Sequence, residues 1–177
     1  MAYHGLLNMD MTQAMNVDAL NRSAVCADDL DNGNAVVLAT VSATAGQGEV
    51  WTATKPATAT LAGCWIVADP EDVLTALKYK GLDPDPRNFY VEATKIFRAI
   101  KPQLGDIIEL NAEAFTAGAG AGSAFANLED GSYKFIWAAA AGAGLSLKLI
   151  GTTYISLGDG SIGTQRVTMY KFVVVVL

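Results

Sequence analysis

The residue types that most often carry out chemistry are scarce in this chain of 177 residues. The single histidine, His4, lies near the N-terminus, so a Ser-His-Asp triad at a central site and a multi-histidine zinc site are both ruled out. Cys26 and Cys64 are too few for a thiolate metal site, and no basic residue stands beside either one to activate its thiol. They could pair with each other, but we expect two buried or half-buried free thiols.

The acidic residues do not assemble a recognisable site either. The segment that starts at Asp29 resembles the beginning of a calcium loop, but its twelfth position is Thr40 and Gly33 comes one residue early. A hairpin turn is the stronger interpretation, because Asn-Gly readily supplies a positive φ. Asp106 and Glu109 fall in an expected strand, where they would point to opposite faces rather than act as an acid–base pair. We therefore expect no catalytic residues, metal or cofactor.

The composition of the chain limits the kinds of partner that it can be expected to bind. The chain is 51% hydrophobic and only 17% charged, with a formal net charge of −6. Without a cluster of lysine and arginine, nucleic-acid binding is not expected. The N-terminus lacks the pattern of a secretion signal, and no apolar run approaches the roughly 20 residues that span a bilayer. We expect a protein that is intracellular or assembled inside a cell, with no membrane partner.

Short segments rich in β-branched and aromatic residues, separated by turn signals, predict a mainly β fold. The expected strands are residues 35–41, 49–53, 61–68, 96–100, 106–110, 133–138, 145–157 and 164–176. Residues 61–68 (LAGCWIVA) are almost entirely apolar, so we expect both of their faces to be covered. One short helix is predicted from Asp69, a capping residue followed by Pro70, to Gly81. This pattern indicates a small antiparallel β-barrel or sandwich.

The chain ends in a very apolar run, residues 172–177 (FVVVVL). A strand of this kind needs a partner on each side, since an open apolar edge promotes aggregation. A turn at residues 158–161 places residues 145–157 on one side of it. On the other side we expect an early strand such as residues 35–41, closing the barrel, rather than a neighbouring subunit.

Residues 1–24 fit neither a helical nor an alternating pattern, and we interpret them as an extended N-terminal arm before a single β-rich domain of residues 25–177. Methionine side chains adapt well to irregular surfaces. A loosely ordered terminus is the alternative interpretation. The candidate contact residues of the N-terminal arm are Tyr3, Leu6, Leu7, Met9, Met11, Met15, Val17 and Leu20.

The order of several motifs resembles a family of small proteins encoded beside the major capsid protein of tailed bacteriophages. The motifs are residues 5–12 (GLLNMDMT), the Gly33 turn, residues 65–71 (WIVADPE), residues 80–83 (KGLD), residues 97–106 (FRAIKPQLGD) and residues 151–153 (GTT). Each motif is weak alone, but together they extend over nearly the whole chain. The Ala/Gly-rich insertions and the low charge depart from the family pattern.

This resemblance implies a non-enzymatic decoration, or cement, protein on the outside of the phage capsid, assembled in the host cytoplasm. Its expected partners are the major capsid protein and further copies of itself, with a homotrimer as one assembly. The alternative is a phage tail or baseplate module that binds a surface glycan through exposed aromatic residues such as Trp51 or Trp137. A small β-barrel enzyme is a third interpretation, for which we can name no residues.

Overall fold

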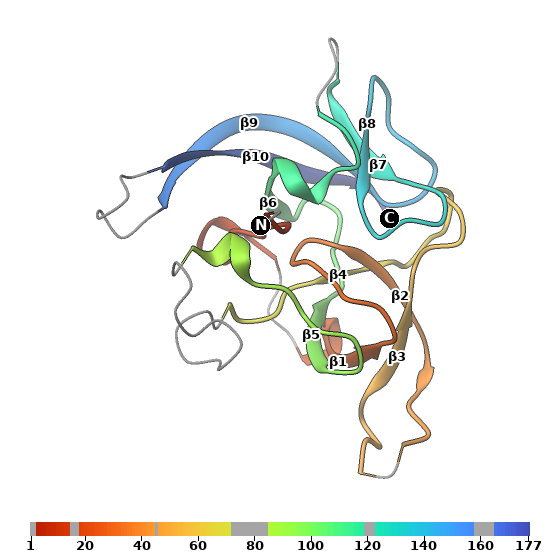
Figure 1. Cartoon of the computed structure of the whole chain (residues 1–177). Coiled ribbons are helices and arrows are strands. Elements are labelled where there is room, and N and C mark those ends of the chain that lie inside the picture. The colour runs from red at the N-terminus through yellow and green to blue at the C-terminus, as the bar shows by residue number, and fades with distance from the viewer. Residues whose placement is uncertain (1–2, 15–17, 45, 72–84, 119–122, 158–164) are drawn as a thin grey trace.

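The protein consists of a small closed barrel with a second β-sheet packed against it (Figure 1). The computed structural model describes residues 3–14, 18–44, 46–71, 85–118, 123–157 and 165–177. Ten strands lie within these ranges, and the helices there are short 3₁₀ turns. These turns are η1 (Met9–Met11), η2 (Asp18–Leu20), η4 (Pro86–Asn88) and η5 (Ala112–Ala114). The expected mainly β fold is confirmed.

The first half of the chain forms the barrel, whose strands follow the order β1-β3-β2-β4-β5. They are β1 (Asn21–Cys26), β2 (Ala35–Val41), β3 (Trp51–Thr54), β4 (Trp65–Val67) and β5 (Ile96–Ile100). β1 closes the barrel by pairing antiparallel with β5 and parallel with β3. The other barrel pairs are antiparallel. β1 begins inside the stretch that we assigned to the N-terminal arm.

Small side chains fill much of the barrel interior, because the interior of a five-stranded barrel is narrow. The buried strand residues there are Ala24, Cys26, Val36, Ala53, Val67, Phe97 and Ala99. Leu30, Phe89 and Val91 from the connecting segments complete this cluster. It is one of two large apolar cores in the described residues.

The second half of the chain forms a five-stranded sheet in the order β6-β10-β9-β7-β8. The strands are β6 (Ile107–Asn111), β7 (Phe125–Leu128), β8 (Phe135–Ala138), β9 (Ser146–Leu157) and β10 (Gln165–Val176). β9 and β10 form the predicted long antiparallel hairpin. Its predicted turn, residues 158–161, lies outside the described residues. We had expected β10 to meet residues 35–41 on its other side, and that was wrong: its neighbour there is β6.

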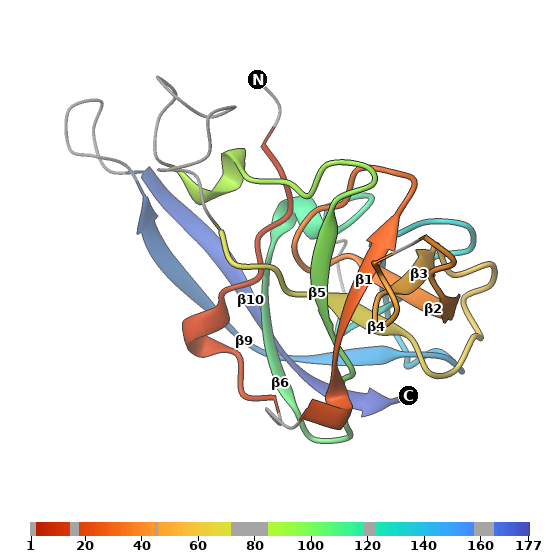
Figure 2. The same cartoon turned by 90° about the horizontal axis from the view of Figure 1, so that it is seen from below.

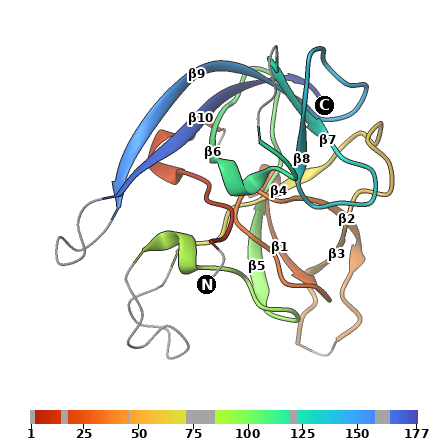
Figure 3. The same ribbon diagram turned by 45° about the horizontal axis from the view of Figure 1, so that its top comes forward.

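The other large core lies between the barrel and this sheet (Figure 3). Ala35, Ile66 and Ile100 of the barrel pack there with Leu110, Phe172 and other residues of the sheet. β4 shows the consequence for a single strand: Ile66 belongs to this core, and Val67 to the barrel interior. The prediction that residues 61–68 are covered on both faces is therefore confirmed for β4, although the strand itself is shorter than expected.

The turn before β2 agrees with its prediction, but the helix predicted for residues 69–81 can be followed only at its start. Residues 32–33 form a turn before β2, as expected, and Gly33 has a φ of +88°. The predicted helix of residues 69–81 lies almost entirely outside the described residues. Asp69, its expected cap, accepts a hydrogen bond from the backbone N–H of Arg98 at 3.0 Å.

Gly33 offers a direct test of how closely the barrel approaches the sheet. A Cβ added there would lie 2.6 Å from Cδ2 of Leu110, which is fully buried. We expect Gly33→Ala to lower the free energy of unfolding by about 2–4 kcal/mol, because left-handed strain and overpacking combine. Gly131→Ala is the matched control, since Gly131 has a φ of +66° but open space around it, and about 1 kcal/mol is expected there. Urea unfolding measures both values, and equal losses would contradict the close approach.

Candidate functional site

Part of the N-terminal arm, within residues 4–13, lies along the outer edge of β6, as Figure 2 shows for the red segment beside that strand. The backbone N–H of Asn8 donates to the carbonyl of Glu109 at 3.0 Å, and that of Asn111 donates to the carbonyl of Leu6 at 3.2 Å. Gln13 and Ile107 exchange two further backbone hydrogen bonds, at 2.8 and 3.0 Å. We call residues 4–13 the docked segment. It covers an edge of the sheet that would otherwise be open.

Two leucines anchor the docked segment on opposite faces of the sheet. Successive side chains of an extended chain point to opposite sides, and both Leu6 and Leu7 are buried. Leu6 packs with Val167 and Met169 on one face, while Leu7 enters the core between sheet and barrel. The docked segment is therefore part of the folded core.

Buried polar groups fix the register of the docked segment. Glu109 is fully buried, and its carboxylate accepts hydrogen bonds from the Asn8 amide and from the Thr153 hydroxyl. Asn111, also fully buried, accepts the N–H of Leu6 at 2.8 Å and donates to the carbonyl of His4 at 3.1 Å. A buried carboxylate without donors is costly, so the Asn8 amide and the Thr153 hydroxyl stabilise Glu109 in this position.

His4 has a structural position at the start of the docked segment. Its Nδ1 lies 2.7 Å from Oδ1 of Asp31, and its ring stacks on Tyr90 with centroids 4.8 Å apart. The backbone N–H of Gly5 donates to the second oxygen of Asp31 at 3.1 Å. These contacts hold the beginning of the docked segment to the turn before β2.

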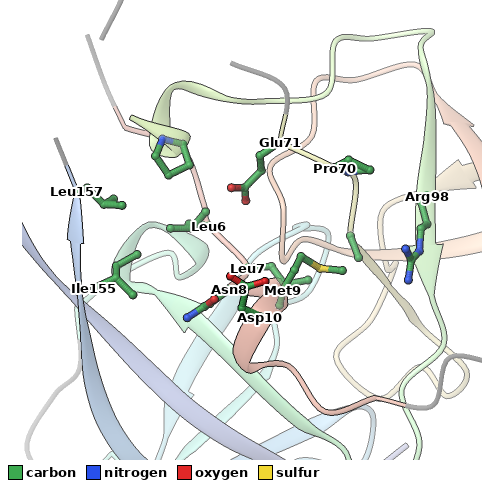
Figure 4. Close-up of a pocket in the computed structure, with 12 residues that line it drawn as sticks. Leu6, Leu7, Asn8, Met9, Asp10, Pro70, Glu71, Arg98, Ile155 and Leu157 are labelled. Atoms are coloured by element: carbon green, nitrogen blue, oxygen red, sulfur yellow. The ribbon is translucent and has the colours of Figure 1, made fainter. Parts of the chain in front are cut away.

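A cavity of about 470 Å³ lies where the docked segment, the barrel and the β9–β10 hairpin meet. Figure 4 shows residues 6–10 across its centre, between Ile155 and Leu157 on one side and Pro70 and Arg98 on the other. Most of these groups are apolar, and Asp10 and Glu71 add two carboxylates. Such a lining suits an apolar group that carries a hydrogen-bond donor.

Burial changes the protonation of one carboxylate in this cavity. It raises the pKa of Glu71 to about 7, an effect that the hydrogen bond from Asn32 reduces and the nearby charge of Asp10 increases. That hydrogen bond, from Nδ2 of Asn32 to Oε1 of Glu71, measures 3.2 Å. Glu71 is therefore partly protonated near neutral pH and can donate as well as accept.

The structure divides the predicted contact residues into exposed and buried groups. Tyr3, Met9 and Met11 have 42%, 37% and 43% of their surfaces exposed. Leu6 and Leu7 are buried, so they hold the docked segment in place and do not form its outer surface. Leu20 is partly buried at the end of η2. Met15 and Val17 lie outside the described residues.

The two tryptophans considered for glycan binding differ in their surroundings. Trp137 is partly buried and stacks on Phe115, with ring centroids 4.6 Å apart. Trp51 packs on the barrel core but also lines a groove of about 400 Å³ together with Asn21, Arg22 and Glu49. Of these two tryptophans, Trp51 is the one that lines a groove together with several polar side chains.

Other chemistry finds little support in the described part of the chain. No group there brings together three or more His, Cys, Asp or Glu residues that could hold a metal ion. Within the same residues, no helix is long and apolar enough to cross a membrane. Cys26 and Cys64 are buried free thiols, as expected, and burial raises the pKa of Cys64 to about 11. Asp106 accepts from the backbone of Gln103 in the turn before β6, away from the hydrogen-bonding partners of Glu109.

Comparison with known proteins finds no relative of this chain, since no family model, curated protein or solved structure matches it.

Sequence reasoning missed the central role of Glu109 and Asn111. One signal was available, since Glu109 falls in the predicted strand of residues 106–110 beside apolar residues, and Asn111 directly follows it. Their partners, Asn8 and Leu6, lie about 100 residues earlier, and nothing local connects the two segments.

The raised pKa of Glu71 predicts how stability depends on pH. The unfolded chain releases this proton near pH 4.5, and the folded protein releases it only near pH 7. Between these values the folded state binds more protons, so the contribution of Glu71 to stability is lost as pH rises from about 4.5 to 7. We expect Glu71→Gln to remove this part of the pH dependence in urea unfolding measured from pH 5 to 8. An unchanged difference between variant and wild type across that range would contradict the assignment.

Proposed function

We propose that this protein binds the outer surface of an assembled tailed-phage capsid and stabilises it as a decoration protein. The observation that carries the proposal is the docked segment, which holds Met9 and Met11 exposed on a fixed backbone. The resemblance of the motif order to phage decoration proteins is a second reason for this proposal. The capsid as partner and the virion surface as location are parts of this proposal.

Holding Met9 and Met11 on a fixed backbone favours binding to the capsid for a physical reason. A disordered segment must lose conformational entropy when it binds, whereas a segment already held by a sheet edge loses less. Methionine side chains can then adapt to the irregular surface of a shell. A protein that binds only the assembled lattice stabilises it by mass action, and many weak contacts repeated over the shell add together.

The groove at Trp51 supports a second candidate, a glycan-binding module of a phage tail or baseplate. Aromatic faces with polar side chains around them suit sugar rings, and Asn21, Arg22 and Glu49 surround Trp51 in this way. The decoration proposal is preferred because the motif order supports it. Sedimentation with capsids and binding to host-surface glycans distinguish the two functions.

The test is co-sedimentation of the purified chain with heads of its phage that lack this protein. Wild type is expected to sediment with assembled heads and not with free capsid subunits. Met9→Ser combined with Met11→Ser should weaken binding by about tenfold or more, equivalent to about 1.4 kcal/mol. Since η1 contains no buried residue, the double variant is expected to stay folded.

Leu104→Ser is the matched control, because Leu104 is also an exposed apolar residue, 64% exposed, in the turn before β6. It should bind heads like wild type. Equal loss in control and double variant would contradict the role of the docked segment. Failure of wild type to bind heads at all would contradict the decoration function itself.

A further inference from the structure

A polar groove of about 310 Å³ lies where turns of the barrel and turns of the sheet meet. Its lining comes from the turn at residues 29–34 before β2, from Lys55 directly after β3, and from residues 131–134 between β7 and β8. All of these residues, together with their neighbours in sequence, belong to the described part of the chain. We call this feature the polar groove.

Backbone hydrogen bonds hold the segments around the polar groove together. The N–H of Gly131 donates to the carbonyl of Pro56 at 3.0 Å, which joins the turn between β7 and β8 to the segment that follows β3. The N–H of Ala35 donates to the carbonyl of Tyr133 at 2.7 Å, which joins the same turn to the start of β2. Figures 1 and 3 show these segments side by side. The groove is therefore formed before any ligand arrives.

Asn34, which lines the polar groove, carries a buried donor without a partner. The residue is only 4% exposed. Its backbone N–H donates to the carbonyl of Asp31 at 3.1 Å, its carbonyl accepts from Val67 at 2.9 Å, and its Oδ1 accepts the N–H of Asp31 at 2.9 Å. Nδ2 alone has no hydrogen-bond partner, and it is the one such buried side-chain atom found in the described residues. Because buried donors are normally paired, a ligand with an acceptor is expected here.

The charged groups of the polar groove offer both donors and acceptors. Nζ of Lys134 donates to the carbonyl of Glu113 at 2.9 Å and lies 3.9 Å from the carboxylate of Asp31, so these two charges are already engaged. Asp29 accepts the N–H of Ala93 through Oδ1 at 2.7 Å, which leaves its second oxygen available. Lys55 is exposed and makes no contact with another described residue that would occupy its ammonium group. A ligand thus meets one cation, one anion and the Asn34 amide.

We propose that the polar groove binds a single ring of a neutral carbohydrate. A hydroxyl group both donates and accepts hydrogen bonds, so the hydroxyls of one ring can accept from Asn34 and Lys55 and donate to Asp29. A carboxylate ligand would lie beside two aspartates, and an ammonium ligand beside two lysines. A neutral ligand avoids both costs and is not repelled by the net charge of −6. The volume suits a small ligand, since binding pockets start at roughly 300 Å³.

This carbohydrate site is separate from the surfaces discussed above. It shares no lining residue with the groove at Trp51, and it does not include the exposed Met9 and Met11. The proposal therefore does not rest on capsid binding or on the glycan-binding alternative.

The test is an NMR titration of the full chain with glucose, galactose, mannose and N-acetylglucosamine in turn. At least one of these sugars is expected to shift the Asn34 side-chain amide signals in a saturable way. Asn34→Asp keeps an oxygen for the N–H of Asp31 but removes the donor, and binding should weaken by about tenfold or more. Since this variant has no Asn34 amide, its binding is read from the backbone amides of residues 131–134.

Lys55→Met should weaken binding of the same sugar by about threefold to tenfold, because it removes one charged donor. Lys148→Met is the matched control, since Lys148 is an exposed lysine of β9 that does not line the polar groove, and it should bind like wild type. Circular dichroism verifies that each variant is folded. If Asn34→Asp is not, Lys55→Met and Asp29→Asn carry the test.

The proposal is overturned if none of these sugars shifts the Asn34 amide signals, or if sugars shift only signals around Trp51. Undiminished binding in the groove variants would overturn it too. Titrations with acetate and with glycine provide the last arm, because saturable binding of either one in place of the sugars would assign the groove to a carboxylate or a zwitterion. None of these results requires phage heads, so the decoration proposal is tested separately.

Discussion

The position of the docked segment, residues 4–13, depends on the buried carboxylate of Glu109. It is fully buried in β6, and the donors that stabilise it come from two distant parts of the chain, Asn8 and Thr153. A carboxylate left without donors in this place would be costly. The polar pair therefore specifies where the N-terminal arm must lie, and Leu6 and Leu7 supply the apolar contacts that stabilise it there.

From this register follow the exposed features of the surface. With Leu6 and Leu7 buried on the two faces of the sheet, the η1 turn at Met9–Met11 stays exposed, and the cavity beside Glu71 lies between the docked segment and the hairpin. The N-terminal arm thus covers the β6 edge and presents apolar side chains. The sequence predicted an extended N-terminal arm that contacts another subunit or the capsid, whereas in the structure residues 4–13 of that arm pair with the sheet of their own chain.

Local sequence patterns were sufficient to predict the strands that are long or apolar on both faces. The β9–β10 hairpin and β4 were predictable for that reason, and so was the turn at Gly33. β1 was not predicted, because Asn21–Cys26 begins with three polar residues and reads as part of the arm. β7 was missed because only four residues follow a Gly-rich loop. The pairing of β10 with β6, and of Glu109 with Asn8, depends on contacts between segments far apart, which no local pattern contains.

The central claim is that residues 4–13 form part of the sheet, held by Asn8 and Glu109, and native-state hydrogen exchange tests it most directly. The amides at positions 8, 13, 107 and 111 bridge the docked segment and β6, and the account predicts slow exchange for all four. In Asn8→Ala they should exchange faster together, by the equivalent of about 1–3 kcal/mol for an unpaired buried acceptor, while barrel amides keep their rates. Exchange at unprotected rates in wild type, or no change in the variant, would contradict the account.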